Sequence, residues 1–209
     1  MHSMVSTEGA QPTAGRRGRP RSFDRATALE KAVMAFWENG YEATSVSDLT
    51  RIMGIGAPSL YAAFGDKRAL FDEAVAEYGR RYAAFGERAL AEEPTARAAV
   101  HRILREAAVR YTSPDRPHGC LYAHAATNCT SPEVGESLRD RRNAGITAVE
   151  DRIRADVAAG VLPEGTDAGA LARCTGAIVQ GMSQQARDGA SRAELEALAE
   201  IALSIWPRT

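Results

Sequence analysis

Apolar residues recur at helical spacing through most of the chain. In the segment after Asp24, for example, Leu29, Val33 and Phe36 fall on one side of a helix. No stretch alternates apolar and polar residues for long enough to predict a strand. The pattern therefore predicts an all-α fold of about nine helices.

Capping residues and glycines set the expected ends of these helices. Asp24 is a good N-cap, as is Asp167, and Ser191 to Glu194 reads as a capping box. Glycines and prolines mark the stops. The expected helices span residues 24–39, 45–53, 57–64, 66–82, 96–111, 120–128, 131–160, 167–188 and 191–206.

The composition is that of an ordinary globular protein, with an uneven distribution of charge. Of the 209 residues, 44% are apolar and 25% are charged, and the net charge is -1. Residues 16–21 nevertheless read RRGRPR and contain no acid. Residues 1–22 are rich in Gly, Ser, Thr, Pro and Arg, and we expect them to form a flexible basic arm.

The remaining bulk features concern compartment and chemistry. Cys120, Cys129 and Cys174 are too few and too scattered for a disulfide framework, which indicates a reducing environment. The chain shows neither a signal-peptide core nor a membrane-spanning apolar stretch, so we expect a cytoplasmic protein. No phosphate-binding glycine loop, HExxH sequence or nucleophile elbow is present. The sequence therefore argues against an enzyme, and we expect no cofactor.

Residues 45–64 have the pattern of a helix-turn-helix. Two short helices are joined by a turn containing Gly54, and inward apolar residues such as Leu49 and Leu60 would fix their crossing. The segment 44–70, TSVSDLTRIMGIGAPSLYAAFGDKRAL, resembles the signature of the TetR (tetracycline-repressor) family of transcriptional regulators. The matching positions are Thr44, Leu49, Gly54, Ile55, Leu60, Tyr61, Phe64, Lys67 and Leu70.

The resemblance implies a division of the chain into three segments. Residues 1–22 would be the arm, residues 23–70 a helix-turn-helix DNA-binding domain, and residues 71–209 a helical ligand-binding and dimerisation domain. It also implies DNA contacts for individual residues. Thr44 and Ser45 would contact phosphate, Tyr61 would place its hydroxyl on the DNA backbone, Lys67 would pair with a phosphate, and Ser59 would enter the groove. The alternatives are that Thr44 is only a cap, Tyr61 only packing and Lys67 only a solvated helix start.

The expected recognition helix departs from the family pattern. Gly56 stands where Ser or Thr is common, and Ala57 replaces a common Lys. Arg and Lys, which read guanine through paired hydrogen bonds, are absent from residues 57–64. Base readout would then depend on Ser59 and on apolar contacts of Ala57 or Pro58 with thymine methyl groups.

The basic arm offers a second means of recognition. Residues 17–21 read RGRPR and resemble the core of an AT-hook, in which arginines enter the narrow minor groove of A/T-rich DNA. Arg17, Arg19 and Arg21 are therefore candidate DNA contacts. The alternative is a basic tail that adds only non-specific, salt-sensitive affinity.

Two C-terminal helices are candidates for pairing two protomers. Their small and branched residues permit close packing, and a two-fold pair would form a four-helix interface. The alternative is that these residues form the core of one protomer. The candidate interface residues are Ile178, Gly181, Leu195, Leu198, Ile201, Ala202 and Ile205.

Polar and aromatic residues interrupt the apolar positions of the C-terminal segment, as in a small-molecule site. The candidate pocket residues are Tyr82, Tyr111, Cys120, Tyr122, His124, Asn128, Gln180 and Gln184. Cys120 and His124 are also four residues apart and, with His118 and Cys129, form the one cluster with metal-ligand chemistry, although it lacks a CxxC pair. We expect no metal, and a reactive thiol at Cys120 is the other alternative.

These observations predict a ligand-responsive transcriptional regulator. The expected form is a homodimeric repressor that a small molecule releases from a palindromic double-stranded DNA operator. The alternatives are a ligand-independent regulator, which a cavity-free C-terminal core would favour, and an architectural protein that binds A/T-rich DNA through the arm.

Overall fold

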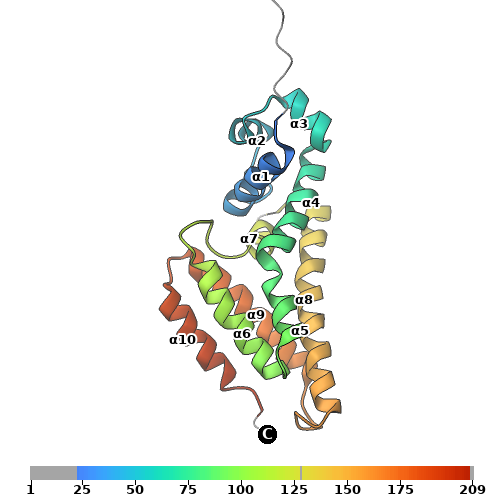
Figure 1. The fold of residues 1–209 in the computed structure, drawn as a ribbon, viewed down its shortest axis with the longest axis vertical. Coiled ribbons are helices and arrows are strands. Elements are labelled where there is room, and N and C mark those ends of the chain that lie inside the picture. Colours follow the sequence, from blue (N-terminus) through green and yellow to red (C-terminus); the bar gives the residue numbers. More distant parts are fainter. Residues whose placement is uncertain (1–22, 128, 208–209) are drawn as a thin grey trace, which may run out of the picture.

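The computed structural model describes residues 23–127 and 129–207, and this part of the chain contains helices and no strand. Ten α-helices and one π-helical turn follow one another along it (Figure 1). The α-helices are α1 (Arg25–Asn39), α2 (Val46–Met53), α3 (Ala57–Phe64), α4 (Lys67–Tyr78), α5 (Phe85–Glu92), α6 (Ala96–Tyr111), α7 (Leu121–Thr127), α8 (Pro132–Ala158), α9 (Ala168–Arg187) and α10 (Arg192–Leu203), and the π turn is η1 (Gly79–Ala83).

The all-α prediction is confirmed, with one more helix than expected. The helix predicted over residues 66–82 is observed as α4 followed by η1, and the additional helix is α5, in a segment for which the sequence predicts no helix. Glycine disfavours a regular helix at Gly79, and a π turn inserted into a helix is a frequent mark of a functional site. The last helix ends at Leu203, three residues before the predicted end, although Trp206 is still buried.

The predicted caps form as expected. Ser45 and Asp48 make a reciprocal capping box at the start of α2, and Ser191 and Glu194 make another at the start of α10. The Asp24 side chain accepts a hydrogen bond from the backbone N–H of Ala26. These local bonds explain why the helix starts could be predicted so closely.

The helices pack around two hydrophobic cores. The first core joins α1 to α4 and also takes in residues from α7 and the beginning of α8. Phe36 lies at its centre, fully buried, with its ring 5.0 Å from that of Phe71 in an edge-on arrangement. Leu121 and Leu138 are fully buried in the same core, so segments distant in sequence complete the packing of the N-terminal helices.

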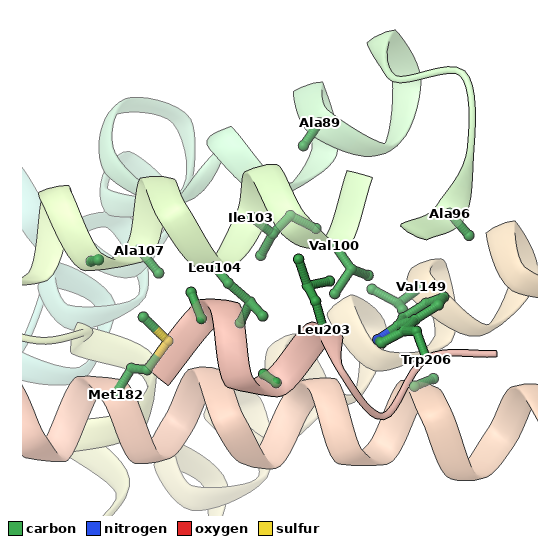
Figure 2. Close-up of a cluster of buried hydrophobic side chains, with 14 of the residues drawn as sticks. Ala89, Ala96, Val100, Ile103, Leu104, Ala107, Val149, Met182, Leu203 and Trp206 are labelled. Carbon is green, nitrogen blue, oxygen red and sulfur yellow. The ribbon is translucent and has the colours of Figure 1, made fainter. Parts of the chain in front are cut away.

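The second core lies between α5, α6, α8, α9 and α10. Figure 2 shows Leu104 of α6, Met182 of α9 and Leu203 of α10 converging on it, with Val149 of α8 beside Trp206. All five side chains are buried. Cys120 packs against both cores and so lies where they meet.

Several contacts besides α4 connect the N-terminal helices to the rest of the molecule. The Glu42 carboxylate, in the turn between α1 and α2, accepts hydrogen bonds from the backbone N–H groups of Thr130 (2.9 Å) and Ser131 (3.0 Å), the latter being the N-cap of α8. Arg187 of α9 donates to the carbonyl of Glu38 at 3.1 Å. The two ends of the molecule are therefore joined by side-chain contacts as well as by the chain.

None of the helices in the described ranges combines the length and the apolar character needed to cross a membrane.

Candidate functional site

Helices α2 and α3 form a helix-turn-helix at one end of the molecule (Figure 1). The turn between them begins at Gly54, whose φ of 74° lies in the left-handed region that favours glycine. Leu49, Leu60 and Phe64 face inward and are almost completely buried. This packing fixes the crossing of the two helices and leaves the opposite side of α3 free.

The free side of α3 carries three of the ten residues predicted to contact DNA. Pro58, Ser59 and Tyr61 are exposed, and Tyr61 keeps 50% of its surface accessible. Ala57 is half-buried at the start of the helix, where Gly56 provides no side-chain cap. An uncapped helix start leaves backbone N–H groups available to an anion such as a phosphate.

The prediction that Thr44 contacts phosphate is wrong. Thr44 is only 2% exposed, and its hydroxyl donates a hydrogen bond of 2.7 Å to the carbonyl of Gly40. The residue closes the turn after α1, as the alternative of a purely structural role supposed. A buried hydroxyl with an internal acceptor cannot reach DNA.

Ser45 is exposed, but its hydroxyl is committed to the capping box. It accepts a hydrogen bond from the backbone N–H of Asp48 at 3.0 Å and donates to the Asp48 carboxylate. Hydrogen bonds from Ser45 and then from Arg51 hold the pKa of Asp48 at about 2. The Ser45 hydroxyl therefore stabilises the start of α2, and its hydrogen is already donated within the protein.

Lys67 lies at the first position of α4, half-buried against the ring of Tyr41. The ammonium nitrogen is 4.2 Å from the centre of that ring. Burial lowers the pKa of Lys67, and the opposing influence of Glu42 favours the charged form. The cation is therefore held against the Tyr41 ring at the start of α4, the helix that follows α3 in the chain.

Other predicted DNA contacts fall outside the described residues. Arg17, Arg19 and Arg21 lie in residues 1–22, so the AT-hook hypothesis stays a prediction.

Arg25 was not among the residues expected to matter at this site. Its side chain donates a hydrogen bond of 3.2 Å to the carbonyl of Ala63 and so connects the start of α1 to the end of α3.

A cavity of about 350 Å³ lies among α4, η1 and helices α5 to α9. Its volume falls at the lower end of the range for small-molecule sites. Of the eight predicted pocket residues, Tyr111, Cys120, Tyr122 and Gln180 line it. The lining that the sequence reading did not select includes Tyr78, Gly79, Phe85, Glu87, Leu90, Ile103, Arg141, Arg142, Ile146, Val149, Thr175, Gly176 and Val179.

Three of the predicted pocket residues lie elsewhere. The Tyr82 hydroxyl contacts Glu30, and its ring is tilted against Trp37 at 5.3 Å. His124 is half-buried away from the cavity, and burial lowers its pKa. Gln184 is exposed and donates to Asp188 at 2.8 Å. Asn128, the fourth, lies outside the described residues.

Cys120 occupies a crowded position on the cavity wall. Its backbone N–H donates to the Ser183 hydroxyl at 2.8 Å. Burial raises the pKa values of Tyr78 and Tyr111 well above their ordinary value, and the neighbouring Cys120 raises them further. Both tyrosines therefore stay neutral phenols. Within residues 23–127 and 129–207, no three potential metal ligands are grouped, so His118 and Cys129 form no centre with Cys120.

The candidate dimer residues divide between the core and the surface. Leu195 is 1% exposed and Ala202 is 7% exposed, so both belong to the core of one protomer, as the alternative supposed. Ile178 and Leu198 are half-buried against that core. The exposed candidates are Gly181, Ile201 and Ile205, with 70% of Ile201 and 54% of Ile205 accessible.

Comparison with known proteins identifies the family. The family model for bacterial regulatory proteins of the tetR family matches residues 28–74. The HTH-type transcriptional repressor ComR of Escherichia coli K12 is 37% identical over 209 residues, covering 97% of this chain and 98% of ComR. The HTH-type transcriptional repressor BdcR of the same organism is 31% identical over 190 residues, covering 88% of this chain and 90% of BdcR.

A solved structure agrees with these relatives. The TetR family transcriptional regulator CifR, a cysteine mutant complexed with 26-bp double-strand operator DNA, is 41% identical with a TM-score of 0.85. The match covers 91% of this chain and 100% of the CifR chain. The protein therefore belongs to the TetR family. The predicted class, a transcriptional regulator and not an enzyme, is confirmed.

Proposed function

We propose that the protein is a transcriptional repressor that binds operator DNA as a homodimer and leaves it when a small molecule fills the cavity. The observation that carries the proposal is the pairing of an exposed recognition helix with a partly open cavity of about 350 Å³. One nearly continuous helical segment connects the recognition helix to the cavity. Helix α4 follows α3 and runs through η1 into the cavity wall. A cytoplasmic protein of this kind meets both chromosomal DNA and small metabolites.

The DNA contacts proposed for this chain come from the outer side of α3 and from its neighbours. Ser59 and the apolar atoms of Ala57 and Pro58 face the major groove, where thymine methyl groups are the complementary partners. Tyr61 and Lys67 contact phosphates. The shortage of base-reading side chains gives the arginines of the arm a role in the flanking minor groove.

The homodimer proposed here pairs the outer sides of α9 and α10. Ile201 and Ile205 are large apolar side chains left in water by the protomer, and the nearby helix α9 presents Gly181, beside which there is open space. Exposed apolar groups of this kind mark an interaction surface when they lie together. A two-fold pair would place two copies of α3 on the two halves of a palindrome.

The cavity distinguishes this function from its alternatives. A regulator whose C-terminal helices only dimerise needs no internal space, and an architectural DNA-binding protein needs no ligand site. A cavity with apolar walls and a few converging polar groups is the usual form of a small-molecule site. It therefore supports a ligand-responsive repressor.

The test is to select DNA from a random pool with the purified full-length protein and then to screen small molecules for release of the selected DNA. A shared palindromic sequence and at least one releasing compound are expected. Uniform recovery of any A/T-rich DNA would overturn the operator proposal. Filling the cavity with a larger side chain, by Val179→Phe on the cavity wall, should abolish release by the same compound.

A further inference from the structure

The arginines of α8 fall into two groups. The helix contains five, and Arg139, Arg152 and Arg154 each pair with an acid on the same helix. Arg141 and Arg142 line the cavity, and neither forms an ion pair with any residue in the described ranges. On α8, the arginines without an ion-pair partner in the described residues are therefore the two that line the cavity.

Arg142 is the more enclosed of the two. It is half-buried, and one of its terminal nitrogens donates to the backbone carbonyl of Tyr122 at 2.7 Å. Because its charge is partly removed from water, burial lowers the pKa of Arg142. A guanidinium has five N–H donors, so the carbonyl satisfies only part of its capacity.

Arg141 lies beside the same tyrosine. Its guanidinium carbon is 5.7 Å from the centre of the Tyr122 ring. The positive charge of Arg141 acts against the rise that burial imposes on the pKa of the Tyr122 hydroxyl. The two arginines thus approach one residue of the cavity wall, Arg141 at the ring of Tyr122 and Arg142 at its backbone carbonyl. A ligand beside Tyr122 would meet both cations.

Little negative charge opposes these cations. Glu87 is the one carboxylate on the cavity wall, and it is exposed on α5. Tyr78, Tyr111 and Tyr122 are neutral because burial raises the pKa of each hydroxyl. The rest of the wall is largely apolar, with Ile103, Val149 and Val179 among its residues.

We propose that the cavity binds a small organic anion, a carboxylate on an apolar body, with the carboxylate at Arg141 and Arg142 and the body against Ile103, Val149 and Val179. This proposal names the effector class and rests on the proposed function. A guanidinium matches a carboxylate through two parallel hydrogen bonds, and such a bond between charged groups is stronger in a site partly shielded from water. A cavity of about 350 Å³ restricts the body to a short aliphatic chain or a single substituted ring.

The experiment compares each carboxylate with its uncharged counterpart of the same shape. The probes are benzoate, 4-methylbenzoate, hexanoate and octanoate, each with its primary amide, bound to the full-length protein in calorimetric titrations. At least one carboxylate should bind saturably and at least tenfold more tightly than its amide. Arg142→Gln should remove the preference, and Arg142→Lys should retain part of it. Arg154→Gln is the matched control, because Arg154 is exposed on the same helix, pairs with Glu150 and Asp151, and does not line the cavity.

The outcomes separate this proposal from the function on which it rests. Amides that bind as tightly as the carboxylates, or an undiminished preference in folded Arg142→Gln, would overturn the anion proposal. Release of operator DNA is measured in parallel. Release by amides alone would leave the repressor intact and refute the anion. Saturable binding of carboxylates of different bulk, none of which releases operator DNA, would support the anion and refute release of DNA by ligands of this class.

Discussion

Replacing Gly79 by alanine should have opposite effects on stability depending on whether residue 122 is tyrosine or phenylalanine. Gly79 has ordinary right-handed helical angles (φ −54°, ψ −51°), so the backbone accepts alanine. A Cβ at this position would lie 2.6 Å from the Tyr122 hydroxyl oxygen but 3.9 Å from the ring carbon that carries it. Only the oxygen is too close, because the larger distance is an ordinary contact.

The magnitude follows from two opposing effects. Alanine stabilises a helix by about 1 kcal/mol relative to glycine. To accommodate it, the Tyr122 hydroxyl must move, which disturbs its hydrogen bond to the Val75 carbonyl (3.3 Å) and the edge-on contact with the Tyr78 ring (5.0 Å between centres). Losing these interactions costs about 1–3 kcal/mol. Gly79→Ala should therefore destabilise the wild type by about 0–2 kcal/mol and stabilise Tyr122→Phe by about 1 kcal/mol.

The assay is urea unfolding followed by circular dichroism for the four proteins of this double-mutant cycle. All are measured at one protein concentration, because dimerisation makes apparent stability depend on concentration. If Gly79→Ala changes the free energy of unfolding equally in both backgrounds, the proposed contact between Gly79 and Tyr122 is refuted. A coupling of about 1 kcal/mol or more would establish it.

Four further predictions concern the DNA-binding surface, the arm, the dimer and pH. Lys67→Ala should weaken binding to all DNA sequences and reduce the salt dependence of log K by about one, measured by fluorescence anisotropy; an unchanged salt slope would remove Lys67 from the interface. Deleting residues 1–21 should lower affinity for an operator with A/T flanks more than for one with G/C flanks, and equal losses would show that the arm is only an electrostatic tail. Ile201→Asp should give a folded monomer in sedimentation, whereas Leu195→Ala should destabilise the protomer by about 2–5 kcal/mol because Leu195 is fully buried; a dimeric Ile201→Asp would refute the proposed interface. The pKa of Asp48 is lowered to about 2 from 3.8, so its contribution to stability is present above pH 3.8 and is lost as the pH falls toward 2. Asp48→Asn should therefore flatten the acid side of a plot of thermal unfolding temperature against pH. An unaltered plot would contradict this.

Local signals in the sequence were sufficient for most of the fold. The capping box at Ser45 and the helix stop at Gly54 act within a few residues, so they can be recognised without knowledge of the packing. Thr44 shows where this reasoning fails. A polar residue next to a cap looks exposed, and only the carbonyl of Gly40, turned back over it by the end of α1, makes it a buried structural residue.

The cavity could be predicted only in part, because its walls come from segments far apart in sequence. His124 was selected along with Tyr122, but two residues along a helix turn the side chain by about 200° and point it elsewhere. Gln184 lies about 6 Å further along α9 than Gln180 and falls beyond the cavity. Arg142 has the sequence signature of a solvated charge. The sequence shows that no acid lies three or four residues away on its helix, but only the fold brings Arg142 to the cavity wall.

The two cores divide the cavity wall between them. Tyr122 packs with the core of the DNA-binding helices, while Ile103 and Val179 pack with the other core, and Cys120 touches both. A bound molecule would therefore lie between the two hydrophobic cores and change how far apart they are. The size of the bound molecule would set the angle between the two cores, and through it the separation of the two α3 helices in a dimer. Compounds of equal affinity but different bulk should then differ in how completely they clear the operator, so that one cavity could distinguish an inducer from a silent competitor by size alone.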